Sequence, residues 1–230
     1  MGWLKDYFAA EREKLGDRPW KEKAEYIWEY YKLWIIGTVC LVWFLGWAGY
    51  RYFLVPRDNW FFAVFTNTYA QVGDESRMWQ DFVDYSGFDT TEKKVAFNNN
   101  SYFALTKTGG AVNKYYEAFV AFADSGELDV VVMEHPHQLA AVGATGRLLD
   151  LNRPECAALR ERYADRLVYA APNDEEYGSE EVPIGIDVRN SLLMTKYRIY
   201  GAESCVLGIG AKCEHLEAVE TFLRFIFQEE

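Results

Sequence analysis

The most prominent hydrophobic pattern in this chain is an uncharged run from Leu33 to Tyr50, which lies between two basic residues. The apolar character continues to Val55 and ends at a proline. A helix needs about 20 such residues to cross the hydrocarbon core of a bilayer, and it pairs its own backbone polar groups there. The pattern therefore predicts a single transmembrane helix over residues 33–55. A deeply buried core helix is the alternative, but such helices usually keep a polar face.

The residues before this run place apolar and charged side chains on opposite faces at helical spacing. Trp3, Leu4, Tyr7 and Phe8 share one face of a first amphipathic stretch, and a second stretch begins at Pro19 and continues without a helix breaker into the apolar run. Aromatic rings with polar tips favour the membrane–water boundary. We interpret residues 1–32 as an amphipathic helical segment at the membrane surface. A soluble helical hairpin packed on itself is the alternative.

Basic residues flank the apolar run unequally. Residues 13–32 hold five Lys or Arg, whereas residues 51–71 hold two. The more basic side of a span stays in the cytoplasm, so the N-terminus is expected inside and residues 56–230 outside the cell. The run is too long for a signal peptide and no small-residue cleavage site follows it, and Cys40 lies in mid-run rather than at a lipoprotein cleavage box. We therefore expect an uncleaved signal anchor and a single-pass protein of the cell membrane.

Beyond residue 58 the pattern changes to strands and helices in alternation. Residues 60–67, 93–99 and 128–135 have the apolar and aromatic content of buried strands, and residues 74–85 and 112–126 have apolar positions at helical spacing. Short turns join these elements. The alternation predicts an α/β domain over residues 56–230, with a mainly parallel sheet flanked by helices.

The later part of this domain is less regular. Its pattern predicts a helix over 153–165, a strand over 166–172, an acid-rich solvated loop over 173–181, extended segments over 182–188 and 192–200, a strand over 205–211 and an amphipathic helix over 214–228.

Charge and cysteine content narrow the class of protein. Residues 1–32 have a net charge of zero, and Arg51 adds one positive charge. Because the whole chain has a net charge of −11, residues 52–230 have a net charge of −12. An acidic domain of this kind is repelled by nucleic acid and by anionic lipid, and we expect no nucleic-acid partner. The four cysteines show no zinc-binding spacing. Cys205 and Cys213 would form a disulfide outside the cell or remain free buried thiols.

Three stretches of the domain resemble the extracellular solute-binding proteins of ABC importers. Residues 128–152 are similar to a segment of those proteins in which a buried strand leads to a short helix, a glycine and an extended piece. Residues 182–188 are similar to the segment by which their chain returns to the hinge, and residues 205–227 are similar to one of their strands followed by a helix. The similarity spans roughly 59–228 and rests on the order of these elements. The matching residues of the first stretch are Asp129, Val130, Val131, Gly146, Leu148, Leu149, Asp150 and Leu151.

The resemblance implies a domain that binds a small solute or a partner protein, next to a transporter or another membrane protein. Family members have two lobes that close on the ligand, whereas the 30 residues between 152 and 183 are too few for a second lobe. The chain therefore resembles a single-lobe, membrane-anchored variant, in which the apolar helix replaces the usual lipid anchor. The N-terminal stretch is similar to that of membrane proteins from Gram-positive bacteria.

Ligands of open α/β sheets bind beyond the carboxyl ends of the strands, and this rule selects the candidate site. The nine residues that follow the predicted strands are Thr66, Asn67, Asn98, Asn99, Asn100, Ser101, Glu134, His135 and His137. The three consecutive asparagines either bind a polar ligand or form a turn. Glu134 with its two neighbouring histidines has the chemistry of a zinc site, but solvated loop-end side chains are the simpler interpretation.

Motifs for catalysis are absent from the sequence. It has no G-x-S-x-G, no P-loop and no G-x-G-x-x-G, and paired carboxylates occur only in the acid-rich loop. We therefore expect a non-catalytic protein without a cofactor. The two main hypotheses are a solute-binding domain and a structural or regulatory membrane protein that acts by protein contacts. A metal-dependent hydrolase using Glu134, His135 and His137 is a distant third.

Overall fold

A computed structural model describes residues 16, 19–53, 58–106, 109–110, 113–170, 180–201 and 203–229. The chain divides into two compact units, Met1–Val55 and Pro56–Glu230. The first amphipathic stretch, residues 3–15, lies outside the described residues, as does most of the acid-rich loop.

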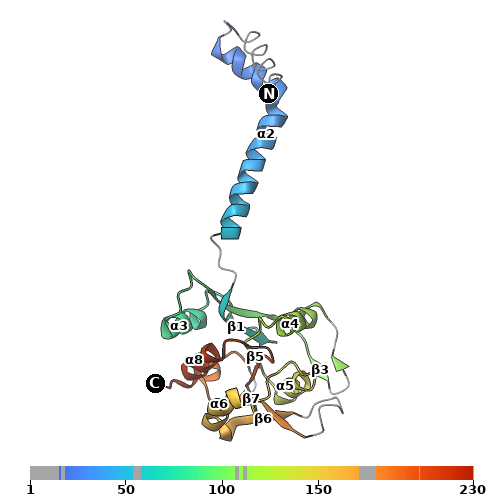
Figure 1. The fold of residues 1–230 in the computed structure, drawn as a ribbon, viewed down its shortest axis with the longest axis vertical. Coiled ribbons are helices and arrows are strands. Elements are labelled where there is room, and N and C mark those ends of the chain that lie inside the picture. The colour runs from blue at the N-terminus through green and yellow to red at the C-terminus, as the bar shows by residue number, and fades with distance from the viewer. Residues whose placement is uncertain are drawn as a thin grey trace. The chain divides into compact units, whose positions relative to one another are not determined.

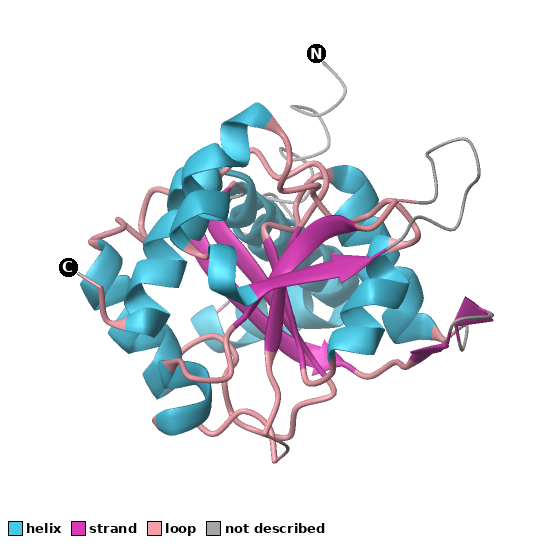
Figure 2. Cartoon of the chain, turned by 90° about the horizontal axis from the view of Figure 1, so that it is seen from below, coloured by secondary structure: helices cyan, strands magenta, loops and turns pink. Residues whose placement is uncertain are grey.

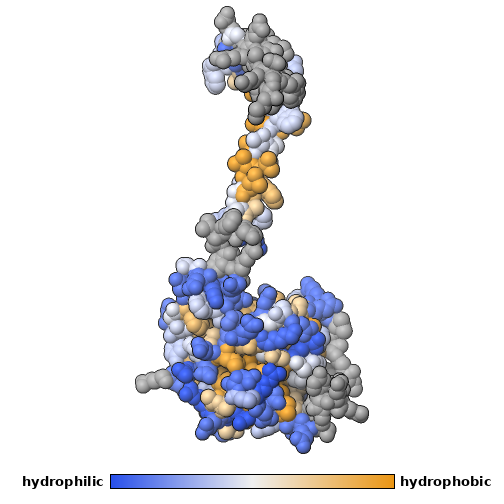
Figure 3. Space-filling view, in the orientation of Figure 1, coloured by the Kyte–Doolittle hydropathy of each residue, from blue (hydrophilic) through white to orange (hydrophobic). Residues whose placement is uncertain are grey.

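The described part of the first unit is formed almost wholly by the long helix α2 (Trp20–Phe53). The helix is unbroken after Pro19, as the sequence predicts (Figure 1). No residue of its most apolar stretch is buried inside the structure (Figure 3). At 1.5 Å per residue, α2 is about 50 Å long and exceeds the roughly 30 Å of a hydrocarbon core. Thr38 donates its hydroxyl to the Trp34 carbonyl oxygen at 2.8 Å, so this polar side chain is paired within the helix. The helix is compatible with a membrane anchor or a signal sequence.

The second unit is built on a six-stranded sheet in the order β2-β1-β5-β8-β7-β6. Figure 2 shows the strands in the centre with helices on both sides. The strands are β1 (Asn59–Thr66), β2 (Lys94–Ser101), β5 (Val130–Met133), β6 (Leu167–Ala170), β7 (Val182–Asp187) and β8 (Val206–Ile209), and β3 (Leu105–Thr106) pairs separately with β4 (Gly109–Gly110).

Alternating side chains of β1 enter two hydrophobic clusters on opposite faces of the sheet. Phe61 and Phe65 point into one cluster, which α3, α6, α7 and α8 cover, whereas Phe62 and Val64 point into the other, below α4 and α5. Both clusters and the whole sheet belong to residues 56–230, so this unit has its own core. The helices are α3 (Arg77–Ser86), α4 (Lys114–Ser125), α5 (Pro136–Gly143), α6 (Ala157–Arg162), α7 (Leu192–Thr195) and α8 (Leu216–Phe227), with short 3-10 turns η1 (Pro154–Cys156) and η2 (Ala164–Arg166) on either side of α6.

Local sequence explains where the main helices begin and end. Ser76 and Asn113 cap α3 and α4 by accepting backbone N–H groups of the first turn, and Gly87 and Gly126 end these helices in the left-handed conformation. The six-stranded sheet with helices between its strands confirms the predicted α/β class.

The prediction of a mainly parallel sheet is only partly matched. Strands β2, β1 and β5 are parallel neighbours, but β8 pairs antiparallel with both β5 and β7, and β6 pairs antiparallel with β7. The composition of β8 does not reveal its direction, because all four residues are buried and a continuous apolar run suits a parallel or an antiparallel strand equally.

Several local predictions were wrong. The segment predicted as extended over 192–200 starts with the short helix α7, and the helix predicted over 153–165 is divided into η1, α6 and η2. Asn98 to Asn100 lie within β2 rather than in a turn, because β2 pairs with β1 as far as Ser101. All four cysteines are free, which agrees with the alternative to a disulfide.

Candidate functional site

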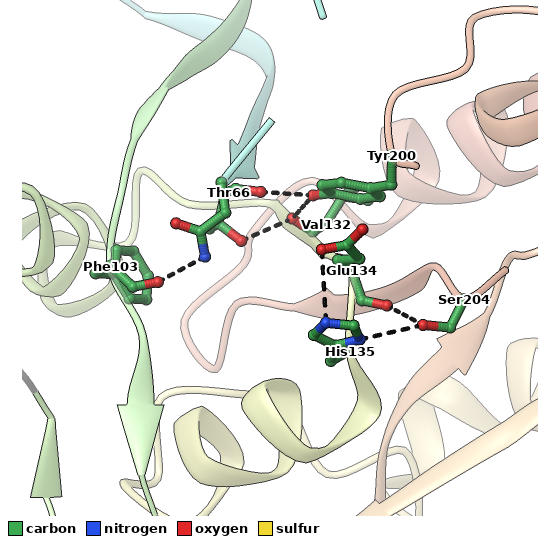
Figure 4. Close-up of polar contacts among 8 residues, drawn as sticks. Thr66, Phe103, Val132, Glu134, His135, Tyr200 and Ser204 are labelled. Atoms are coloured by element: carbon green, nitrogen blue, oxygen red, sulfur yellow. Dashed lines mark hydrogen bonds and ion pairs between the residues drawn. The ribbon is translucent and has the colours of Figure 1, made fainter. Parts of the chain in front are cut away.

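The antiparallel direction of β8 decides which segments meet at the carboxyl ends of β1 and β5. Val206, the first residue of β8, pairs with Met133, the last residue of β5. The described residues that precede β8, 198–201 and 203–204, therefore lie at the same edge as the residues that follow β1 and β5. Figure 4 shows Tyr200 and Ser204 from this segment beside Thr66 and Glu134.

Buried hydrogen bonds hold this edge together. The Tyr200 hydroxyl lies 2.8 Å from both the Thr66 and the Val132 carbonyl oxygens, and the Thr66 hydroxyl donates to the Val132 carbonyl at 3.3 Å (Figure 4). Thr66 is fully buried and Tyr200 is 7% exposed. Burial raises the pKa of Tyr200 well above its ordinary value, so this phenol stays protonated. Thr66, a predicted ligand residue, thus has a structural role here.

Two loops are joined across this edge by further hydrogen bonds. Thr68 donates its hydroxyl to the Ile199 carbonyl at 2.5 Å, and Tyr102 donates its hydroxyl to the Thr68 carbonyl at 3.0 Å. Asn67 donates its side-chain amide to the Phe103 carbonyl at 2.6 Å. The residues after β1 are therefore held in place from both sides before any ligand arrives.

A hollow of about 500 Å³ opens between these loops. We call it the carboxyl-edge hollow. Its lining residues are Asn67, Tyr69, Ala70, Glu134, Arg198, Ile199, Tyr200 and Gly201.

Two side chains of the carboxyl-edge hollow project into solvent. Tyr69 is 92% exposed, and its ring lies 5.8 Å from that of Tyr102. Arg198 is exposed and makes no hydrogen bond or ion pair with the residues that the structure describes. Of the four non-glycine residues with positive φ in the described part of the chain, Asn67 (54°) and Arg198 (50°) line this hollow.

Glu134 and His135 contact each other and Ser204, which precedes β8. The Glu134 carboxylate lies 3.5 Å from Nε2 of His135, and Ser204 donates its hydroxyl to the Glu134 carbonyl oxygen (Figure 4). His137 is exposed, and its ring stacks on that of His135 at 5.2 Å. Among the described residues, no three His, Cys, Asp or Glu side chains are arranged to hold a metal ion. Glu134 lines the carboxyl-edge hollow, whereas His135 and His137 do not.

Asn98, Asn99 and Asn100 line a different hollow of about 880 Å³, along the outer edge of β2. The loop before α3 and α3 itself protect this edge: Asp74 of the loop accepts the Phe97 N–H at 2.7 Å, and Trp79 of α3 donates its indole N–H to the Val95 carbonyl at 2.6 Å. A strand edge with such contacts is covered against pairing with another chain. Ser101 is buried and lines neither hollow. The predicted ligand residues therefore do not form one site.

A third polar cluster surrounds Asp129 at the opposite end of β5. Its carboxylate accepts the Phe62 N–H at 2.8 Å and lies 3.2 Å from the Cys213 sulfur and 3.1 Å from Nδ1 of His215. Burial raises the pKa of Asp129 and of the Cys213 thiol. The thiol is therefore a hydrogen-bond donor and a poor nucleophile. His215, just before α8, is thereby paired with this buried acid.

Sequence reasoning missed Tyr69, Arg198, Tyr200 and Ser204. The first follows Asn67 closely and the rule of strand ends would have included it with a longer window. The other three depend on the direction of β8, for which the sequence carries no signal.

Comparison with known protein families, with curated proteins and with solved structures found no match for this chain.

Proposed function

We propose that this chain is a single-pass membrane protein whose extracytoplasmic domain binds a small solute in the carboxyl-edge hollow and does not catalyse a reaction. The observation that carries this proposal is the position of that hollow at the carboxyl ends of β1 and β5, with Asn67, Glu134 and Arg198 set among apolar side chains in its lining. Ligands of open α/β sheets bind at this edge. A volume of about 500 Å³ lies within the roughly 300–1,000 Å³ that is usual for small-molecule sites.

The composition of the lining also supports a binding site. Arg198 offers donors that no described residue uses, and Tyr69 offers an exposed aromatic face. The loops that carry them are joined by buried hydrogen bonds, so little ordering is required when a ligand binds. The resemblance to solute-binding proteins is in agreement, with one lobe in place of two.

The proposed location follows from α2 and its flanking charges. The helix is long and apolar enough to span a membrane, and the excess of Lys and Arg before it favours a cytoplasmic N-terminus. A reporter enzyme that is active only outside the cytoplasm, fused after Glu230, should therefore be active. A reporter that fluoresces only in the cytoplasm should be dark at the same position. The reverse pattern would contradict the proposed orientation.

A structural or regulatory role through protein contacts is the competing function. It would be favoured by a flat apolar face at the strand ends, whereas the carboxyl-edge hollow is concave and contains Asn67, Glu134 and Arg198. The first function is therefore the better supported.

A thermal-shift screen of residues 56–230 tests the proposal. The panel contains sugars, amino acids, short peptides and metal ions, and a ligand present at 100 times its Kd should stabilise the domain by about 2.7 kcal/mol. Tyr69→Ala should weaken binding of any hit without loss of stability, because this side chain is almost fully exposed. Tyr169→Ala, at a 49% exposed position on β6, is the matched control and should bind normally. Absence of stabilisation by every compound would refute solute binding.

A further inference from the structure

We infer that the hollow of about 880 Å³ along β2 is a docking groove for an extended, basic segment of a partner polypeptide. Carboxamide side chains of the groove would pair with the backbone amides of that segment. We call this hollow the β2 groove. The inference concerns a second surface and does not rest on solute binding, because the β2 groove and the carboxyl-edge hollow share no lining residue.

Carboxamides are the most frequent polar side chains in the lining of the β2 groove. They belong to Asn59, Gln71, Asn98, Asn99 and Asn100. Two of them are used by the fold, since Asn99 donates to the Ala70 carbonyl at 3.2 Å and Asn98 accepts the Asn100 N–H at 2.8 Å. The side chains of Asn59, Gln71 and Asn100 make no hydrogen bond with any residue that the structure describes. The groove therefore presents amide donors and acceptors that the described fold leaves unpaired.

A register shift in β2 brings the three consecutive asparagines into one groove. Neighbouring side chains of a regular strand point to opposite faces. Val95 and Phe97 follow this rule and enter one hydrophobic cluster, whereas Ala96 packs on the other. Between Asn98 and Ser101, β2 has one residue more than the paired part of β1. Such a bulge re-aims the side chains of its strand, and it explains why strand alternation does not divide these carboxamides between two faces.

Unpaired carboxamides of this kind suit the backbone of an extended polypeptide. Each peptide group offers one N–H donor and one carbonyl acceptor, and a carboxamide offers the complementary pair. Pairing of a partner strand with the edge of β2 is blocked, because Asp74 and Trp79 already hold backbone groups of Phe97 and Val95. The side-chain amides are what remains for the main-chain hydrogen bonds that give affinity for extended segments.

The charges of the β2 groove select a basic segment. Its charged lining residues are three acids, Asp74, Glu75 and Glu127, and one lysine, Lys94, which gives a formal net charge of −2. Glu75 and Glu127 are exposed and form no ion pair with the described residues. Residues 52–230 as a whole have a net charge of −12, so an acidic segment would be repelled. Complementary charge also raises the association rate of a basic segment.

The test measures the fluorescence anisotropy of a labelled peptide of alternating Lys and Thr, with the full-length protein in micelles of an uncharged detergent. A peptide of about ten residues is about 33 Å long when extended, which exceeds the eight residues of β2. Two altered peptides are compared with it. One has Glu in place of Lys, and the other has methylated amide nitrogens at the Thr positions.

The Lys–Thr peptide should bind, and each altered peptide should bind about 10 to 100 times more weakly, because it loses either the attracting charges or several backbone donors. Equal binding of the methylated peptide would overturn recognition of the backbone. Equal binding of the Glu peptide would overturn selection by charge. Absence of binding at about 1 mM Lys–Thr peptide would overturn the docking groove itself.

The double variant Gln71→Ala with Asn100→Ala tests the carboxamides. Both residues are exposed, so the melting temperature should stay within about 2 °C of the wild type. Binding of the Lys–Thr peptide should weaken about 10 times through the lost hydrogen bonds. Asn190→Ala is the matched control, because Asn190 is an exposed asparagine that lines neither hollow. Unchanged binding by the double variant would overturn the role of the carboxamides.

Other occupants of the β2 groove give different results in the same assay. Displacement of the peptide by an uncharged oligosaccharide would overturn a polypeptide ligand. A dimer of the wild type that the double variant dissociates would show a second copy in the groove and would overturn the partner segment. Tyr69→Ala alters the carboxyl-edge hollow and should leave peptide binding unchanged. Failure of the peptide to bind would therefore leave the proposed solute binding untouched.

Discussion

Tyr200→Phe removes the hydroxyl group that makes two buried hydrogen bonds beside the carboxyl-edge hollow. The hydroxyl lies 2.8 Å from the carbonyl oxygens of Thr66, the last residue of β1, and Val132, the last but one of the adjacent strand β5. With its single proton it donates to these two acceptors, and at 7% exposure water does not replace it. A buried group left without its partner costs about 1–3 kcal/mol. We therefore expect the free energy of unfolding to fall by about 2 kcal/mol, which corresponds to a melting temperature about 4–8 °C lower for a domain of this size.

Urea denaturation of residues 56–230, followed by the fluorescence of Trp60 and Trp79, measures this loss. The slope of the transition should stay unchanged, since the variant alters stability and not the surface exposed on unfolding. Tyr85→Phe is the matched control: its hydroxyl donates to the Glu229 carbonyl at 2.9 Å, but the residue is 44% exposed. Its effect should stay within about 0.5 kcal/mol, because water replaces the lost partner. If the two variants lose the same free energy, the Tyr200 hydrogen bonds do not hold the strand ends together.

Two further predictions concern the rest of the domain. Gly210→Ala should give little folded protein, because the new Cβ would overlap the Leu128 carbonyl oxygen. Gly146→Ala, at a φ of 72° with open space around it, should lower the free energy of unfolding by only about 1 kcal/mol. The yield of folded protein on expression, checked by circular dichroism, compares the two variants. Burial holds the pKa of Asp129 above its ordinary value, so the folded state binds more protons and stability should fall as the pH rises from about 4 until this acid ionises. Urea titrations of the wild type and Asp129→Asn across this range should converge as the pH is lowered, and parallel curves would contradict the pKa shift.

The candidate site shows where reasoning from strand ends succeeds and where it fails. Asn67 and Glu134 do line one hollow, because β1 and β5 are parallel neighbours and their carboxyl ends meet. The asparagines of β2 satisfy the same rule, but β2 is the edge strand, and its side chains line a hollow on the outer side. Position in the strand order therefore matters as much as position along the strand, and the chain's local pattern does not reveal the strand order.

The sequence by itself determined the elements and their faces. The uncharged run from Leu33 predicts the long helix, and the alternation of Phe61 and Phe62 into opposite clusters follows from the period of a strand. These features depend on neighbouring residues only. The tertiary structure alone decided that β8 runs antiparallel between β5 and β7, and thereby that Arg198 and Tyr200 reach the carboxyl ends of β1 and β5. Pairing between distant strands depends on how the whole core packs, and a fully buried strand carries no mark of its direction.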